Sequence, residues 1–69
     1  MSLAFGNTGE KYSIQNICGN PRMRQYLYKL GFMPGQTIEI VNKNGANVIV
    51  SVMGTRVALS FSVANKIHI

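Results

Sequence analysis

The sequence lacks aspartate and tryptophan, and it contains one cysteine, one histidine and only two acidic residues. A single cysteine cannot form a disulfide within the chain. An enzyme needs a nucleophile, an acid–base pair or a metal, and Cys18, His68, Glu10 and Glu39 form no recognisable catalytic set. No glycine-rich run ends in Lys-Ser or Lys-Thr, the pattern that binds nucleotide phosphates. We therefore predict that the protein is not an enzyme and does not itself bind a nucleotide.

Long apolar runs are also missing. No stretch approaches the roughly 18 residues that cross a bilayer, and no basic-then-apolar signal peptide opens the chain. A chain of 69 residues buries only about 60% of its unfolded surface, which leaves little room for an enclosed site. We predict one cytoplasmic domain, residues 1–69, with no membrane insertion of its own.

The charge is strongly unbalanced, because seven lysines and arginines oppose two glutamates and give a formal net charge of +5. Such a balance suits an acidic partner, whether nucleic acid, anionic lipid or an acidic protein face. A net charge of about 2 to 8 is also ordinary for the solubility of a small domain. Charge alone therefore does not identify a partner.

A helix is predicted over residues 21–30. Asn20 followed by Pro21 is a helix-start signal, because the Asn side chain accepts from an early N–H and proline suits the first helical position. Gly31 is where a left-handed C-terminal cap is needed. At 100° per residue, an apolar stripe expected to face the core contains Met23, Tyr26, Leu27 and Leu30. The solvent face then contains Arg22, Arg24, Gln25, Tyr28 and Lys29.

Alternating apolar residues predict strands around the helix. An N-terminal strand is expected, with core-facing side chains from Phe5, Tyr12, Ile14 and Ile17. Met33 to Gln36 has the Pro34-Gly35 pair of a type II turn. A strand is expected to begin at Gln36, with Ile38 and Ile40 pointing inward. Turns at 42–45 and at Gly54-Thr55 separate two further strands, 48–53 and 56–60. A helical turn over 60–65 and a last strand, 66–69, complete a sheet that curls on itself, because closure removes exposed edges.

This order of elements, with LGFMPGQTIEIV at its centre and GTRVALSFSVANKIHI at its end, resembles the ferrous iron transport protein A family, or FeoA-like domain. The resemblance covers nearly the whole chain. It implies a mostly β fold: a five-stranded SH3-like small barrel with one α-helix between strands 1 and 2 and a helical turn before the last strand. It also implies an accessory or regulatory role in bacterial ferrous iron uptake, beside a membrane ferrous iron permease with a cytoplasmic GTP-binding domain.

The metal ligands are few and scattered. Ferrous ion prefers histidine and carboxylate ligands supplied by two or three side chains. His68, Glu39 and Cys18 show no ligand spacing along the chain, so ferrous iron binding is unsupported and we predict no required cofactor and no specific metal site.

An exposed aromatic among basic residues is typical of protein interfaces. Tyr28 is the expected anchor of a partner-binding surface, and its other candidate residues are Arg24, Lys29, Met33, Pro34 and Arg56. Gly31, Gly35 and Gly54 are expected to serve as structural turns.

Three functions remain open at this point. The first is a protein-binding module on the iron permease, and the second is a small basic barrel that binds nucleic acid. Phe5, Tyr12, Tyr26, Phe32 and Phe61 are expected to point mostly inward, which disfavours the second. The third, a weak ferrous ion binder, depends on the poor ligand set.

Overall fold

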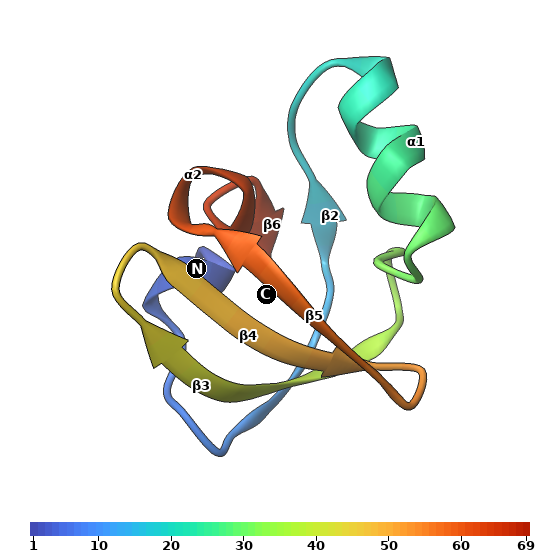
Figure 1. The fold of residues 1–69 in the computed structure, drawn as a ribbon. Coiled ribbons are helices and arrows are strands. Elements are labelled where there is room, and N and C mark those ends of the chain that lie inside the picture. Colours follow the sequence, from blue (N-terminus) through green and yellow to red (C-terminus); the bar gives the residue numbers. More distant parts are fainter.

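The computed structural model describes all 69 residues and is mostly β, as predicted (Figure 1). The chain begins with a 3-10 turn, η1 (Leu3–Phe5), and two short strands, β1 (Lys11–Ser13) and β2 (Asn16–Ile17). Helix α1 (Pro21–Lys29) follows. The remaining elements are β3 (Thr37–Asn44), β4 (Asn47–Val52), β5 (Thr55–Ser60), α2 (Phe61–Ala64) and β6 (Ile67–His68).

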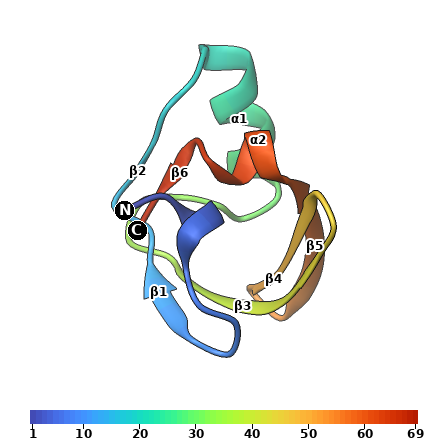
Figure 2. The same cartoon turned by 90° about the vertical axis from the view of Figure 1, so that its left-hand side faces the viewer.

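The strands form two antiparallel sheets rather than one closed barrel (Figure 2). Four strands pair in the order β1-β3-β4-β5, and β2 pairs only with β6. The predicted closure into one barrel is therefore wrong, whereas the predicted count of five strands is close to the observed one and the curled SH3-like shape is present. The cause is a change of partner after β1: the Ile14 N–H donates to Gln36 O at 2.9 Å, and the Gln15 N–H donates to His68 O at 2.7 Å. The expected single N-terminal strand is consequently two.

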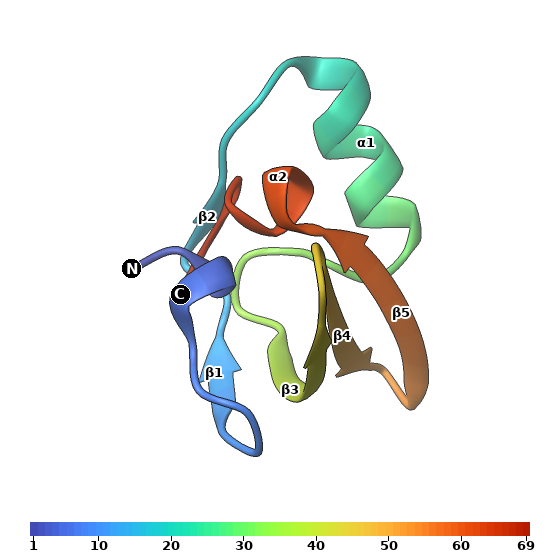
Figure 3. The same ribbon diagram turned by 60° about the vertical axis from the view of Figure 1, so that its left-hand side comes forward.

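The core is one cluster of 14 buried apolar residues, with no buried charged or polar side chain. Ile38 and Ile40 point inward as predicted. The residues of β3, β4 and β5 that are at most 4% exposed are Ile38, Ile40, Val48, Val50, Val52 and Leu59. Helix α2 contacts η1 and β5 and lies over the open side of the curved sheet (Figure 3). Ser60 caps α2 by accepting from the Val63 N–H at 3.3 Å.

The N-terminal residues differ from the prediction. Leu3 and Ala4 are buried, whereas Phe5 is 63% exposed and its ring meets that of Phe61 edge-on, with centroids 5.7 Å apart. The 3-10 turn explains this difference, because it replaces the expected strand and turns Phe5 away from the core. The alternation of a strand therefore does not apply at this position.

Both hairpin turns lie one or more residues from their predicted places. β3 extends through Asn44, and a bulge between Ile40 and Asn42 shifts its register. Asn44 pairs with Asn47 across a two-residue turn, so residues 42–44 belong to the strand rather than to the turn. The second turn consists of Met53 and Gly54, because Val52 pairs directly with Thr55.

Leu27 anchors α1 and gives the first test. It is the helix's one fully buried residue, at 0% exposed. Leu27→Ala should lower the free energy of unfolding by about 2 to 5 kcal/mol, because it leaves a cavity in a small core. The neighbouring exposed Tyr26 supplies the control, and Tyr26→Ala should change stability by no more than about 0.5 kcal/mol. Urea unfolding of both variants measures this, and an unchanged midpoint for Leu27→Ala would contradict the packing of α1.

Candidate functional site

Helix α1 stands apart from the four-stranded sheet (Figures 1 and 3). Asn20 caps its start, and the Asn20 Oδ1 accepts from the Met23 N–H at 2.8 Å. Leu27 faces the core, while Met23 and Leu30 are half-buried beside it. The prediction that Tyr26 is a core residue is wrong, because Tyr26 is 57% exposed.

Tyr26 and Tyr28 are geometric counterparts. Each lies about 100° around the helix from Leu27, on opposite sides. Tyr28 is 37% exposed, against 57% for Tyr26. The predicted apolar stripe was therefore centred too far toward Tyr26. Tyr26 lies at the edge of that stripe, and a residue at the edge can remain in solvent while the others are buried. The helix has a tyrosine on each flank.

The end of α1 is fixed by backbone hydrogen bonds. The Gly31 N–H donates to Tyr28 O and the Phe32 N–H donates to Leu27 O, both at 2.9 Å. This pair of bonds is a Schellman motif, and it requires the left-handed conformation that Gly31 adopts, with φ of 101°. Phe32 then packs back into the core at 0% exposed. The predicted helix end is confirmed.

A tight turn follows at once. The Gln36 N–H donates to Met33 O at 3.0 Å, and Gly35 has φ of 90°, which fits the type II turn that Pro34-Gly35 predicted. Gly35 also donates its N–H to Ile14 O at 2.8 Å. The turn is therefore tied to the segment that joins the two sheets, and exposed Met33 and Pro34 are held on rigid backbone.

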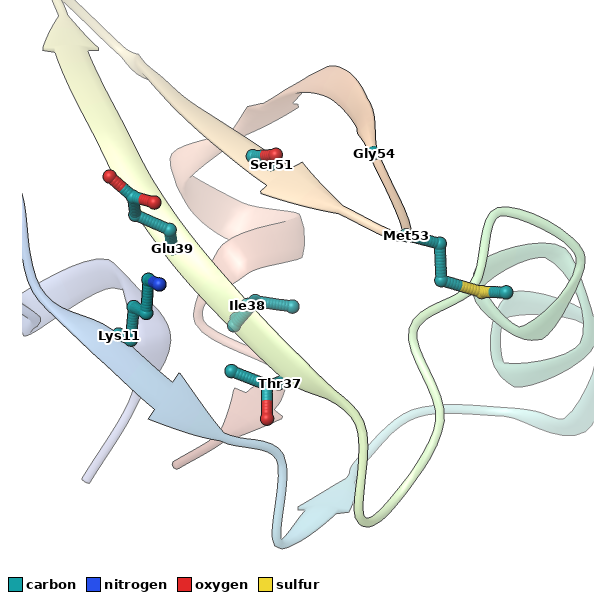
Figure 4. Close-up of a pocket in the computed structure, with 7 residues that line it drawn as sticks. All are labelled: Lys11, Thr37, Ile38, Glu39, Ser51, Met53 and Gly54. Carbon is teal, nitrogen blue, oxygen red and sulfur yellow. The ribbon is translucent and has the colours of Figure 1, made fainter.

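Met53 is a residue of this region that the sequence analysis did not single out. It is 71% exposed and has φ of 49°, the one non-glycine residue with positive φ. Its side chain reaches from the β4–β5 turn toward the loop after α1 (Figure 4), where a methyl group added to Gly31 would lie 3.0 Å from Met53 Sδ. Two-residue hairpin turns with positive φ favour Asn, Asp and Gly. Methionine is unusual at such a position, and its place directly before Gly54 was the sequence feature that could have drawn attention to it.

The six candidate docking residues occupy three places. Tyr28, Lys29, Met33 and Pro34 are all exposed at the C-terminal end of α1 and its following turn; we call these four the docking surface. Arg24 is half-buried, and its guanidinium donates to Gly19 O before the helix start. Arg56 lies on β5, directly opposite Ser51.

Arg56 belongs instead to a polar row across the outer face of the sheet. Lys11 pairs with Glu39, Glu39 with Ser51, and Ser51 with Arg56. A shallow hollow of about 220 Å³ lies on this face, and Figure 4 shows its lining: Lys11, Thr37, Ile38, Glu39, Ser51, Met53 and Gly54. The hollow contains no aromatic side chain and only one carboxylate.

A second hollow, of about 300 Å³, lies on the opposite flank of α1 from Tyr28. It is lined by Asn20, Arg22, Met23 and Tyr26, all from the helix and its cap. The wrong inward placement of Tyr26 concealed this hollow from the sequence analysis.

Two of the potential metal ligands do come together. Cys18 Sγ lies 3.1 Å from His68 Nε2, although the residues are 50 positions apart. Glu39 is on the four-stranded sheet, and no group of three or more His, Cys, Asp or Glu side chains could surround an ion. The contact was invisible to local spacing because it depends on the pairing of β2 with β6.

The curled sheet, the inserted helix and the two-stranded closure define a small SH3-like β protein. The FeoA domain family model matches residues 1–69. The chain belongs to the FeoA family.

Similar solved structures agree with this assignment. An iron uptake regulatory protein, FeoA, is 31% identical, with a TM-score of 0.89 over 97% of this chain and 91% of that one. FeoA from Stenotrophomonas maltophilia, complexed with zinc, is 26% identical, with a TM-score of 0.86 over 99% and 87%. That protein is described as an SH3-domain protein proposed to activate bacterial ferrous iron transport.

A manganese-dependent transcriptional repressor shares the fold at 17% identity, with a TM-score of 0.87 over 97% of this chain and 39% of the repressor. A search of curated proteins finds no match. Neither α-helix has the length and the apolar content of a membrane-spanning segment. FeoA is associated with ferrous iron transport and is not a known enzyme family.

The rigidity of the helix end can be tested at Gly31. Gly31→Ala should lower the free energy of unfolding by about 1 to 3 kcal/mol, because an L-residue is strained at this φ. Met53 Sδ is the end of a flexible side chain, so adding Met53→Ala to this variant should recover little of the loss. Urea unfolding of the two single variants and the double variant measures the coupling. Full recovery in the double variant would show that the contact with Met53, rather than backbone strain, makes alanine unfavourable.

The available ligands also predict weak binding of ferrous ion. Anaerobic titration followed by backbone amide shifts should give weak, scattered changes, because neither glutamate joins Cys18 and His68 and ferrous ion prefers carboxylate with histidine. A saturable, stoichiometric response centred on His68, Glu39 or Cys18 would contradict this expectation.

Proposed function

We propose that this chain is a small cytoplasmic accessory or regulatory protein of ferrous iron uptake. It acts by binding the cytoplasmic GTP-binding domain of a membrane ferrous iron permease. The docking surface, Tyr28, Lys29, Met33 and Pro34, is the proposed contact. The observation that carries the proposal is the rigid presentation of these exposed side chains on a member of the FeoA family.

The composition of the docking surface supports a protein partner. Tyrosine and methionine are enriched at the centres of interfaces, whereas lysine belongs at the rim. Tyr28 is the largest side chain of the four and the expected anchor. Met33 is 50% exposed in the turn that follows the helix, which adds an apolar side chain at the same end of α1.

The backbone of the docking surface also favours binding. The Schellman motif and the Pro34-Gly35 turn fix the positions of Tyr28 and Met33 before any partner arrives. A surface that is already ordered loses less conformational entropy on association. Rigidity of this kind is not needed for simple solubility.

Charge should act mainly on the rate of association. Lys29 is exposed in the last turn of α1, and the chain carries a formal net charge of +5. An acidic face on the partner would be attracted from a distance, and salt would screen the attraction. We therefore expect Lys29 to affect mainly the rate of association with the partner, and Tyr28 to affect mainly the affinity.

Nucleic acid binding is the second candidate, and the structure changes the argument about it. The expectation that most aromatics point inward is wrong, since Phe5, Tyr26 and Phe61 are 63%, 57% and 44% exposed. However, Phe5 and Phe61 pack against each other at η1 and α2, and the two helix tyrosines lie on opposite flanks. Binding of single strands uses several aromatics along one groove, and these four do not share one face.

The proposal is tested by matched pairs of helix variants. Tyr28→Ala should weaken binding to the permease's isolated GTP-binding domain by more than about 1 kcal/mol, as expected of a hot spot. Tyr26→Ala, on the other flank, should leave the affinity unchanged. Lys29→Ala should slow association and reduce its salt dependence more than Arg22→Ala does. Surface-plasmon resonance at two salt concentrations gives both rate constants.

Single-stranded RNA serves as the competing ligand in the same assay. If the wild-type protein binds RNA with a steep salt dependence and ignores the permease domain, the nucleic-acid function replaces the proposed one. Equal losses from Tyr26→Ala and Tyr28→Ala would instead contradict the assignment of the docking surface.

A further inference from the structure

We propose that the free edge of β5 binds an extended segment of a partner protein, which joins the four-stranded sheet as a further strand and places an acidic residue opposite Arg56. β5 is the last strand in the order β1-β3-β4-β5, and Figure 3 shows no strand on its outer side. The proposed binding edge is distinct from the docking surface, and the proposal does not depend on binding to a permease.

The backbone of β5 has hydrogen-bonding groups that no neighbouring strand uses. In an antiparallel ladder, residues bonded to the neighbouring strand alternate with residues whose N–H and C=O groups point away from it. The Phe61 N–H donates to Ala46 O at 2.7 Å, one step beyond the last pair of β4 with β5, and this bond sets the alternation. The residues whose N–H groups face the free edge are therefore Arg56, Ala58 and Ser60.

The edge of β5 lacks the features that usually prevent strand addition. Natural sheets protect their edges with short strands, lysine, proline or bulges. β1, at the opposite edge, has only three residues and begins with Lys11. β5 has six residues with neither lysine nor proline, and its register with β4 is continuous. Ala58 is small and exposed, so the backbone of a partner can approach the middle of this edge.

The charges on the outer face of the sheet indicate the chemistry of the partner. The polar row runs from Lys11 through Glu39 and Ser51 to Arg56, which ends it at the free edge. The Arg56 guanidinium forms no hydrogen bond, since Arg24 is the only arginine whose guanidinium does so. Opposite charges on facing residues of neighbouring strands attract. A strand added beside β5 should therefore carry Asp or Glu opposite Arg56.

A second copy of this chain fits the edge less well than an acidic partner does. β5 contains no acidic residue, so no register between two β5 strands gives Arg56 an acidic neighbour. Two chains that each carry a formal net charge of +5 also repel one another. The committed occupant is therefore an extended acidic segment of a different protein.

The side chains of β5 also constrain the residues next to that acid. Val57 is half-buried on the inner face, and its neighbours Arg56 and Ala58 point to the outer face. In strand addition, backbone hydrogen bonds supply affinity and alternate side chains supply specificity. We expect an apolar β-branched residue opposite Val57 and a small residue opposite Ala58.

The experiment uses the acetylated and amidated peptide Thr-Val-Thr-Val-Glu-Thr, whose glutamate lies opposite Arg56 in an antiparallel register. The peptide is titrated into the isotope-labelled full-length protein, and backbone amide shifts are followed. Saturable changes should centre on Arg56, Ala58 and Ser60. The amides of Lys11 and Ser13, on the other free edge of the same sheet, should change little.

Modified peptides test the backbone bonds and the charge pair without changing the protein. N-methyl groups on the glutamate and the central threonine should abolish binding, because these two amides face β5 in the proposed register. Replacing the glutamate by glutamine should weaken binding by up to about 5-fold, the range of a cross-strand charge pair. In Arg56→Gln, the glutamate and glutamine peptides should bind equally.

A proline variant tests the edge from the side of the protein. Ala58→Pro removes an N–H that faces the free edge and leaves the bonds to β4 in place, so it should weaken binding at least about tenfold. Ser13→Pro is the matched control and should bind as wild type. The Ser13 N–H also faces a free edge, because the next residue, Ile14, donates its N–H to Gln36 O across the sheet. Urea unfolding of both variants shows whether the fold is kept.

Four results would overturn the proposal. They are the absence of saturable shifts with the wild-type protein, equal binding of the N-methylated peptide, an equal response at the β1 edge, and a dimer of the free protein that Ala58→Pro converts to a monomer. The last result would assign the edge to a second copy. None of these results would alter the effect of Tyr28→Ala on permease binding, so the two proposals fail separately.

Discussion

The fold depends on the change of hydrogen-bond partner at Ile14 and Gln15. Ile14 donates to Gln36 before β3, and Gln15 donates to His68 on β6, so two adjacent residues connect the two sheets. Ile14 itself is 1% exposed and belongs to the core. This junction sets the register of β2 with β6, which brings Cys18 to His68, and it leads the chain to the start of α1. It also accepts the Gly35 N–H through Ile14 O, so the turn after α1 is fixed to the same point.

Features that depend on interactions between residues close in the sequence could be predicted, whereas features that depend on residues far apart in the sequence could not. The cap at Asn20 and the turns at Gly31 and Gly35 were predictable, because each depends on a few neighbouring residues and, at the glycines, on φ values that few side chains tolerate. The alternation of Ile38 and Ile40 was equally local. The switch between sheets was not predictable, since the backbone donors of Ile14 and Gln15 carry no sequence signal for their partners.

The candidate sites show the same division. Tyr28 and Met33 were predictable as exposed because the helix pattern and the turn define them locally. Tyr26 was misplaced because helical spacing gives the relative angles of residues, whereas the inward direction is set by tertiary packing around Leu27. The Cys18–His68 contact needs the register between two strands at opposite ends of the chain. Met53 was missed because its importance lies in a contact with Gly31, more than twenty residues earlier.

Exposure alone is weak evidence for function in so small a protein. Seven large apolar residues are exposed, and a short chain has too little interior to bury them all. The end of α1 differs from the other exposed apolar positions in its backbone. Met53 retains a positive φ that costs a non-glycine residue free energy, and it does so beside the Schellman motif at Gly31. A glycine at that turn position would remove the strain but also the side chain that covers Gly31. The end of α1 is held instead by the backbone hydrogen bonds at Gly31 and Gly35. This ordered backbone distinguishes Tyr28 and Met33 from the other exposed apolar residues, because a surface that is already ordered loses less conformational entropy on association.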